Sequence, residues 1–174
     1  MVSVTNTHLI GVKKITPPTL FQDFRGEYIE LYNRDLYRKA GVEIDFVQDD
    51  ISVSTKNVLR GIHGDQVTTK LISCLLGKIY LVIVNCDEQS EQYRKWQSFI
   101  ISDKNRYQIL VPPRFGVAHY ILTEKAIFHY KQSTYYNRES QFTIRWDDPN
   151  LAIDWPVKDP ILSARDATSE IKKI

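Results

Sequence analysis

Hydrophobic and polar residues alternate over many short segments of this chain, as in β-strands that have one face in a core. The run Ile79–Val84 is apolar on both faces, which predicts a central strand. We expect Lys70–Leu76 and Lys78–Cys86, on either side of Gly77, to form a hairpin. The other predicted strands are His8–Ile15, Tyr28–Tyr32, Phe46–Ser54, Asn57–Ile62, Trp96–Ile101, Tyr107–Val111, Ala118–Thr123 and Ala126–Thr134.

Helical signals are few. Asn33 is a suitable N-cap for a short helix over Arg34–Ala40, which Gly41 would end. The tail Trp146–Ile174 is interrupted by prolines, and we expect it to wrap the edge of a sheet and to contain a short helix near its end. Many short strands with almost no helix predict an all-β, double-sheet barrel of the jelly-roll or cupin type, formed by residues 1–174 as a single domain.

Composition narrows the classes of function. The 174 residues are 43% hydrophobic and 25% charged, and 10 Tyr, 7 Phe and 3 Trp favour strands and large packed faces. A net charge of +2 argues against a nucleic-acid or membrane-surface partner. Met1–Leu9 lacks the pattern of a signal peptide, so we expect a cytoplasmic protein with Cys74 and Cys86 as reduced, buried thiols.

The first chemical signal is the segment Val58–Asp65, which places Arg60 and His63 at the end of a predicted strand. Arginine carries a permanent positive charge, and histidine exchanges a proton near neutral pH. Together they suit an anionic substrate held beside an acid–base centre. Taken alone, however, a histidine at a strand end is more often a hydrogen-bonded structural residue.

Several stretches, in this order, resemble the dTDP-4-dehydrorhamnose 3,5-epimerase family. The resemblance extends from Ile15 to about Ala167. The stretches are Asp23-Phe24-Arg25-Gly26, Phe46-Val47-Gln48-Asp49, Asn57-Val58-Leu59-Arg60-Gly61-Ile62-His63, Tyr130-Lys131 with Tyr135-Tyr136, Ile153-Asp154-Trp155-Pro156 and Leu162-Ser163-Ala164-Arg165-Asp166.

The resemblance implies a cupin-like jelly roll, a homodimer that exchanges an N-terminal arm (residues 1–18), and epimerisation of nucleotide-linked 4-keto-6-deoxy sugars without metal or cofactor. By motif position, His63 is the expected general base and Asp166 the carboxylate that orients it. Tyr130 is the expected acid on the opposite face of the sugar, and Lys70 the partner of the C4 oxygen. Such a reaction needs a base, stabilisation of the enolate and an acid on the other face.

A second set of residues is expected to bind the substrate. Arg25 and Arg60 can hold diphosphate oxygens in a forked geometry, and Tyr136 or Trp155 can stack on the base or sugar. The full set of expected binding residues is Arg25, Glu30, Gln48, Arg60, Asp65, His119, Tyr136, Trp155 and Arg165.

The chain departs from the family pattern at two places that are expected to line the sugar pocket. The loop Gly64–Thr69 is shorter than usual. Val117 stands where the family carries a second active-site histidine, and His119 follows two residues later on the same strand face. In both features the chain resembles the branch of the family that epimerises GDP-linked 4-keto-heptoses for bacterial capsules more than it resembles the rhamnose enzymes.

Other functions compete with this interpretation. A 3,4-ketoisomerase of the same sugars uses the same scaffold, and a nucleotide-sugar-binding barrel without activity would be consistent with Val117. A metal-dependent cupin would need a His-x-His pair, which the sequence lacks. Individually, Tyr130 could be barrel core, Asp166 a helix cap, and Lys70 and Arg25 surface charges.

Overall fold

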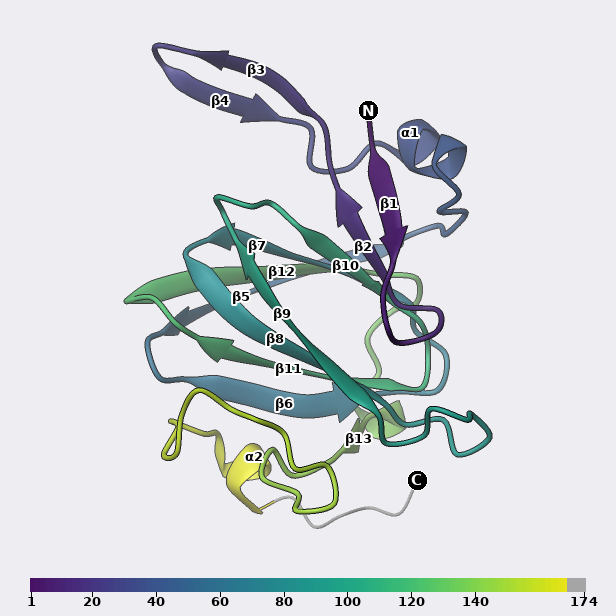
Figure 1. Cartoon of the computed structure of the whole chain (residues 1–174), viewed down its shortest axis with the longest axis vertical. Coiled ribbons are helices and arrows are strands. Elements are labelled where there is room, and N and C mark those ends of the chain that lie inside the picture. Colours follow the sequence, from purple (N-terminus) through teal and green to yellow (C-terminus); the bar gives the residue numbers. More distant parts are fainter. Residues whose placement is uncertain (169–174) are drawn as a thin grey trace.

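In the computed structural model of the protein, which describes residues 1–168, two antiparallel sheets face each other and enclose a core (Figure 1). The larger sheet has six strands, in the order β1-β2-β10-β7-β12-β5. These strands are β1 (Ser3–Asn6), β2 (Lys13–Thr16), β10 (Gln108–Val111), β7 (Lys70–Leu76), β12 (Lys125–Gln132) and β5 (Gln48–Thr55).

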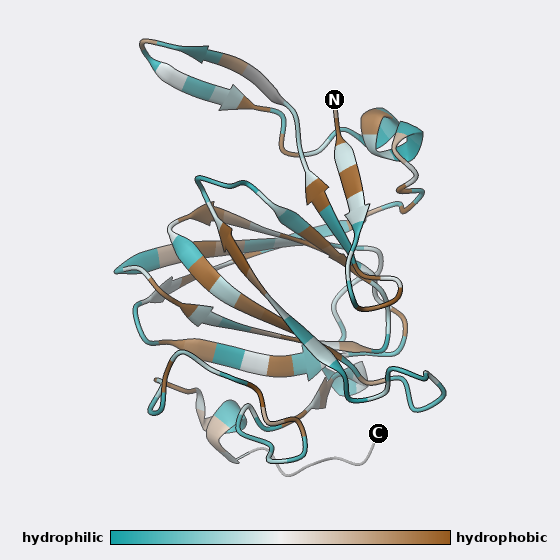
Figure 2. Ribbon diagram, in the orientation of Figure 1, coloured by the Kyte–Doolittle hydropathy of each residue, from teal (hydrophilic) through white to brown (hydrophobic). Residues whose placement is uncertain are grey.

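The second sheet has five strands, in the order β13-β6-β11-β8-β9. They are β13 (Phe142–Thr143), β6 (Leu59–Gly64), β11 (Phe115–Ile121), β8 (Lys78–Asn85) and β9 (Trp96–Ser102). Strand β8 lies between β11 and β9 and is buried over most of its length, which confirms the predicted central strand. Hydrophobic segments alternate with polar ones along both sheets (Figure 2).

Helices are confined to the periphery. The helix α1 (Arg34–Lys39) begins at Asn33, whose side chain accepts hydrogen bonds from the backbone N–H groups of Asp35 and Leu36, as predicted. A 3-10 turn, η1, covers Arg138–Ser140, and α2 (Ala164–Thr168) is the short helix expected in the tail. No helix among residues 1–168 has the length and apolar character needed to span a membrane.

The main core lies between the two sheets. It joins Ile72 of β7 and Phe128 of β12 to Leu81 and Ile83 of β8, all of them buried. Both cysteines are free and buried, as predicted, and burial raises the pKa of each thiol to about 12.

The prediction that β7 and β8 form a hairpin is wrong. Strand β7 pairs with β10 and β12, whereas β8 pairs with β9 and β11 in the other sheet. Gly77 carries the chain from one sheet to the other with a φ of +79°, and a Cβ there would lie 2.3 Å from the carbonyl oxygen of Lys125. The strand pattern therefore identified both strands but not the sheet to which each belongs.

The N-terminal segment also differs from the prediction. The expected strand His8–Ile15 is a strand only from Lys13, and β1 precedes it as an additional strand. Strand β1 pairs with β2, and β2 pairs with β10 of the same chain. The exchange of residues 1–18 between subunits stays a prediction.

A β-bulge in β6 orients two of the candidate residues. Opposite β6, Val117 pairs with His63 and His119 pairs with Arg60, so β6 has one more residue than β11 over this interval. Residues three apart in a regular strand point to opposite faces, but the extra residue turns Arg60 and His63 to the same face. Gly61 permits the close approach, because a Cβ there would lie 2.5 Å from the carbonyl oxygen of Val117.

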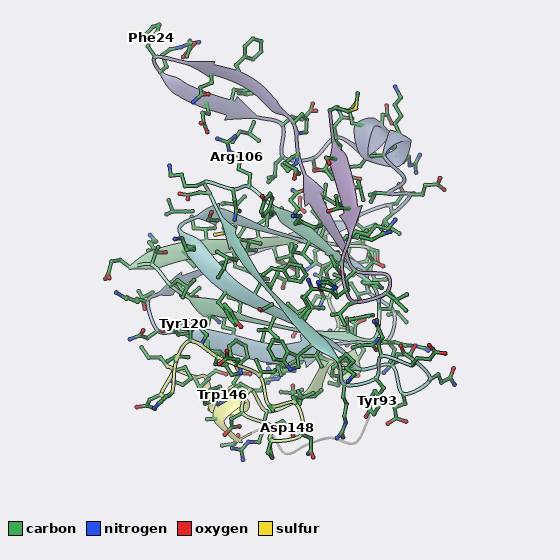
Figure 3. All side chains as sticks on the ribbon, viewed as in Figure 1. Phe24, Tyr93, Arg106, Tyr120, Trp146 and Asp148 are labelled. Atoms are coloured by element: carbon green, nitrogen blue, oxygen red, sulfur yellow. The ribbon has the colours of Figure 1, made fainter. Side chains whose placement is uncertain are left out.

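Two segments lie outside the sandwich. The hairpin of β3 (Thr19–Asp23) and β4 (Gly26–Ile29) projects away from the two sheets, with Phe24 at its tip (Figures 1 and 3). The tail packs Ile153 and Trp155 against the buried Ile62, Val82 and Val84 of the five-stranded sheet, and Ile161 bonds to the edge of β6. It therefore covers a face of that sheet as well as its edge; residues 169–174 of the predicted wrap lie outside the described part.

Candidate active site

A cavity of about 250 Å³ lies between the two sheets and draws its walls from both. Of the residues selected from the sequence, it brings together Arg60, His63, Lys70, His119, Tyr130, Tyr136 and Arg165. The remaining lining residues are Ser52, Ile72, Val117, Phe128, Gln132 and Gln141.

His63 and Asp166 form a close polar contact in the site, with Nε2 of His63 lying 2.6 Å from Oδ1 of Asp166. Asp166 is 3% exposed and sits in α2, where Ser163 accepts a hydrogen bond from its backbone N–H. Burial acts to raise the pKa of Asp166, but the hydrogen bond and charge of His63, with further bonds from Ser163 and Gly61, outweigh it and hold this pKa below its usual value. A charged carboxylate therefore orients the imidazole.

Lys70 supplies a half-buried cation to the cavity. It begins β7 directly opposite Gln132 of β12, and no hydrogen-bond or ion-pair partner for its ammonium occurs among residues 1–168. Burial lowers the pKa of Lys70, and the negative charge of Asp65 opposes that shift. An unpaired ammonium in such a place is suited to stabilise negative charge that develops on a bound molecule.

Tyr130 lines the cavity on the same face of β12 as Ala126 and Phe128, as the period-two pattern predicted. Burial raises the pKa of its phenol to about 12, and the negative charge of Asp50 acts in the same direction. Asp50 is the cross-strand partner of Tyr130 in β5. The phenol therefore stays protonated, and able to donate, at any ordinary working pH.

The two arginines that line the cavity are held in place by hydrogen bonds to hydroxyl groups. The Nε of Arg60 donates to Oγ of Ser54 at 3.0 Å. The guanidinium of Arg165 donates twice to Oγ1 of Thr143, at 3.0 and 2.5 Å. Both arginines keep other N–H groups for an anionic ligand.

Asp65 and Gln48, which the sequence predicts to bind substrate, instead form hydrogen bonds with segments next to the cavity. Asp65 is 3% exposed; its Oδ1 accepts from the backbone of Val67 and Thr68, and its Oδ2 accepts from Gln141. The Oε1 of Gln48 accepts the backbone N–H of Tyr136 at 2.9 Å. Neither residue lines the cavity, so in this chain both hold lining segments in place.

Three other predicted binding residues are not brought to the cavity. Arg25 lies in the turn of the β3–β4 hairpin and forms an exposed ion pair with Asp23. Glu30 accepts a hydrogen bond from Asn33 next to α1. Trp155 packs against Tyr80 and Trp146 on the outer side of the five-stranded sheet, with its ring centroid 5.8 Å from that of Tyr80 and 6.3 Å from that of Trp146. The predicted stacking of Trp155 on a base or sugar is therefore not compatible with its position.

The sequence reasoning missed Ser52, Gln132 and Gln141. Ser52 lies on the inward face of β5 and Gln132 on the inward face of β12, so the alternation of side chains along each strand could have identified them. Gln141 lies in an irregular segment that gives no such signal. Among residues 1–168, no group of three or more His, Cys, Asp or Glu side chains has a geometry that could hold a metal ion.

Chemically, the cavity presents an oriented imidazole, a protonated phenol and an ammonium to one bound molecule. This set can remove a proton from carbon, stabilise the resulting enolate oxygen and return a proton from another direction. Arginines at the same cavity can bind the phosphate groups of such a molecule.

Comparison with known proteins gives the same family as the sequence motifs. The sequence profile of the dTDP-4-dehydrorhamnose 3,5-epimerase family matches residues 6–172. The enzyme of that name from Shigella flexneri is 34% identical over 160 residues, which are 90% of this chain and 88% of that protein.

Solved structures agree in fold. A dTDP-6-deoxy-D-glucose-3,5-epimerase from Legionella pneumophila, in complex with dTDP-4-keto-L-rhamnose, superposes with a TM-score of 0.92 at 36% identity, over 98% of this chain and 93% of that chain. A dTDP-4-dehydrorhamnose 3,5-epimerase from Bacillus anthracis, with TDP and PPi bound, gives a TM-score of 0.93 at 35% identity, over 98% and 99% of the two chains. These matches confirm the cupin-like jelly roll, and the chain belongs to the dTDP-4-dehydrorhamnose 3,5-epimerase family.

Proposed function

We propose that this protein epimerises a nucleotide-linked 4-keto-6-deoxy sugar, inverting C3, C5 or both, with no cofactor. The observation that carries the proposal is the His63–Asp166 pair at 2.6 Å, in one cavity with Lys70 and Tyr130. The relatives named above are epimerases of dTDP-linked sugars, which supports the same substrate class for this chain.

In this proposal His63 removes the proton from the carbon next to the C4 ketone. The carbonyl lowers the cost of that step because the charge moves to O4, where the ammonium of Lys70 stabilises it. Tyr130 then gives its phenolic proton to the opposite face of the planar intermediate. Asp166 fixes the tautomer of His63 and stabilises the imidazolium that forms, as a carboxylate does for a catalytic histidine elsewhere.

The diphosphate would be held by Arg60 and Arg165, with Tyr136 available to stack on the base or sugar. All three line the same cavity as His63, which supports one continuous site. The finer choices between GDP and dTDP, and between hexose and heptose, are part of the proposal. His63-Gly64-Asp65, together with Val117 and His119, favours the GDP-heptose branch.

A homodimer is also part of the proposal. The β3–β4 hairpin exposes Phe21, Phe24 and Tyr28, with 71%, 98% and 65% of their surfaces accessible. Exposed aromatic side chains at this density indicate an interaction surface. Because Arg25 lies on this hairpin and outside the cavity of its own chain, we infer that it reaches the site of a second copy.

The direct test is deuterium exchange. The purified protein is incubated in D₂O with GDP- and dTDP-linked 4-keto-6-deoxy hexoses and heptoses, and C3 and C5 are followed by NMR. Deuterium at either carbon, with inversion, supports the proposal. Interconversion of 4-keto and 3-keto products would instead indicate a ketoisomerase. Tight nucleotide-sugar binding without exchange on any substrate would indicate a binding protein, the alternative suggested by Val117.

A further inference from the structure

Two buried polar atoms of the cavity lack a partner. The Oγ of Ser52 and the Nε2 of His119 are both inaccessible to solvent, and neither forms a hydrogen bond within residues 1–168. Both residues line the cavity that contains His63. A buried donor or acceptor without a partner is rare in folded proteins and usually indicates a missing water or ligand group.

The two residues approach the same place from opposite sheets. Ser52 in β5 is the cross-strand partner of Phe128 in β12. The ring of His119, in β11, stacks on the ring of Phe128 with centroids 3.9 Å apart and planes 8° apart. Ser52 and His119 therefore flank one phenyl ring in the interior of the barrel, one beside it and one over its face.

A purely structural role does not account for His119. A phenyl group would give the same stacking on Phe128 without burying Nε2, a ring nitrogen that makes no hydrogen bond within residues 1–168. Proton transfer does not account for it either. Burial lowers the pKa of His119 to about 3, with the charges of Arg60 and His63 acting in the same direction, so the ring stays neutral at working pH.

We propose that Ser52 and His119 form a subsite that binds one hydroxyl group of the sugar. A neutral imidazole offers one donor and one acceptor, and a serine hydroxyl offers both, so a ligand hydroxyl is complementary to the pair. A methyl or methylene group at the same place would leave both protein atoms without partners. The inference rests on the proposed function, because the subsite belongs to the same cavity, and it adds a specificity determinant to that function.

Binding calorimetry with stable nucleotide sugars tests this without turnover. The ligands are pairs that differ by one hydroxyl, such as dTDP-glucose with dTDP-6-deoxyglucose or dTDP-2-deoxyglucose, and GDP-mannose with GDP-6-deoxymannose. The proteins are the wild type, Ser52→Ala, His119→Phe and His119→Gln. Val53→Ala, on the outer face of the same strand, is the control.

In the wild type, removing the bound hydroxyl should weaken binding about tenfold, the effect of one lost hydrogen bond with a buried partner left open. In Ser52→Ala and His119→Phe the same removal should change the affinity less than about twofold, and His119→Gln should retain part of the preference. Val53→Ala should behave as the wild type.

The proposal is overturned if the wild type discriminates against none of the deoxy ligands. It is equally overturned if the variants lower the affinity for the hydroxyl and deoxy ligands by the same factor. That result would mean that Ser52 and His119 hold only an ordered water or support the fold. Deuterium exchange by the wild type is scored separately. Exchange without any hydroxyl preference rejects this subsite alone, whereas a hydroxyl preference without exchange rejects the proposed epimerase and leaves the subsite standing.

Discussion

Nε2 of His63 lies 2.6 Å from Oδ1 of Asp166, although 103 residues separate the two in the chain. The bulged strand β6 supplies the imidazole, and the C-terminal helix α2 supplies the carboxylate. Asp166 is almost completely buried, whereas 27% of the His63 side chain is exposed. The pair therefore has one end fixed in the protein and the other open to a ligand, the arrangement required of an oriented base.

Removing His63 should stop catalysis and removing the charge of Asp166 should slow it strongly, in both cases without preventing ligand binding. His63→Asn should abolish deuterium exchange, and Asp166→Asn should slow it by about 10²–10⁴-fold, because the amide no longer stabilises an imidazolium. Both should bind the nucleotide within a few-fold of wild type by calorimetry. Exchange at the wild-type rate in His63→Asn would rule out its role as the base.

Tyr130→Phe should separate the two half-reactions. Proton removal by His63 needs no phenol, so loss of the C3 or C5 proton to D₂O should continue, while inversion should fall by roughly 10²-fold or more. NMR measures both in one sample. Equal loss of washout and inversion would contradict the role of Tyr130 as the acid on the opposite face.

Asp65→Asn should reduce stability in a pH-dependent way. Burial acts to raise the pKa of Asp65, but hydrogen bonds from Val67 and Thr68 and the charge of Lys70 bring it below its usual value. Because the folded pKa is lower than the unfolded one, the stabilisation is complete above about pH 4 and is lost as pH falls through the folded pKa.

Urea unfolding between pH 7 and pH 3 measures this effect. Asp65→Asn should lower the free energy of unfolding by about 1–3 kcal/mol at pH 7, and the difference from wild type should shrink towards pH 3. The matched control is Asp159→Asn, an exposed side chain with no hydrogen bond among residues 1–168. A difference that stayed constant across this range would exclude the carboxylate charge as its origin.

Gly61→Ala should distort the bulge that turns Arg60 and His63 to the same face. Gly61 has a φ of +113°, and a Cβ would lie 2.5 Å from the carbonyl oxygen of Val117. The substitution should cost about 2–5 kcal/mol of stability. Gly26→Ala is the control, because Gly26 has a φ of +125° but no atom within 4 Å of a Cβ, so only the backbone strain of about 1 kcal/mol applies. Equal losses would mean that the contact with β11 is unimportant.

Complementation tests the proposed exchange of hairpins. Arg25→Ala and His63→Ala should each have low activity alone. If the hairpin of one subunit completes the site of the other, each mixed dimer has one intact site, so refolding an equal mixture should restore about a quarter of wild-type activity. No recovery in a mixture shown by mass spectrometry to contain mixed dimers would place Arg25 outside the site.

Much of the fold was predictable from local pattern. Period-two alternation identified β5 and β12, because a strand with one buried face must alternate in polarity, and a run that is apolar on both faces identified the central strand β8. Asn33 identified the start of α1, since its side chain can accept the unpaired N–H groups of the first turn. The ordered motifs also predicted that His63, Lys70, Tyr130 and Asp166 would meet.

Local pattern could not decide which strands share a sheet, because pairing depends on contacts between distant segments. Gly77 looks like a hairpin turn in the sequence, and only the packing of β7 on β12 and of β8 on β11 makes it a crossing between sheets. Trp155 and Asp65 carry side chains suited to ligand binding, and only the tertiary structure turns Trp155 to the outer face and uses both carboxylate oxygens of Asp65 within the protein.

The sequence by itself thus determined most of the strands, the family and the residue types of the site, because these depend on side-chain chemistry and near neighbours. The tertiary structure alone decided which side chains face one cavity. A one-residue bulge in β6 and the docking of α2 set the direction of His63, and the burial of Ser52 and His119 without partners arises only when two sheets close over the same space.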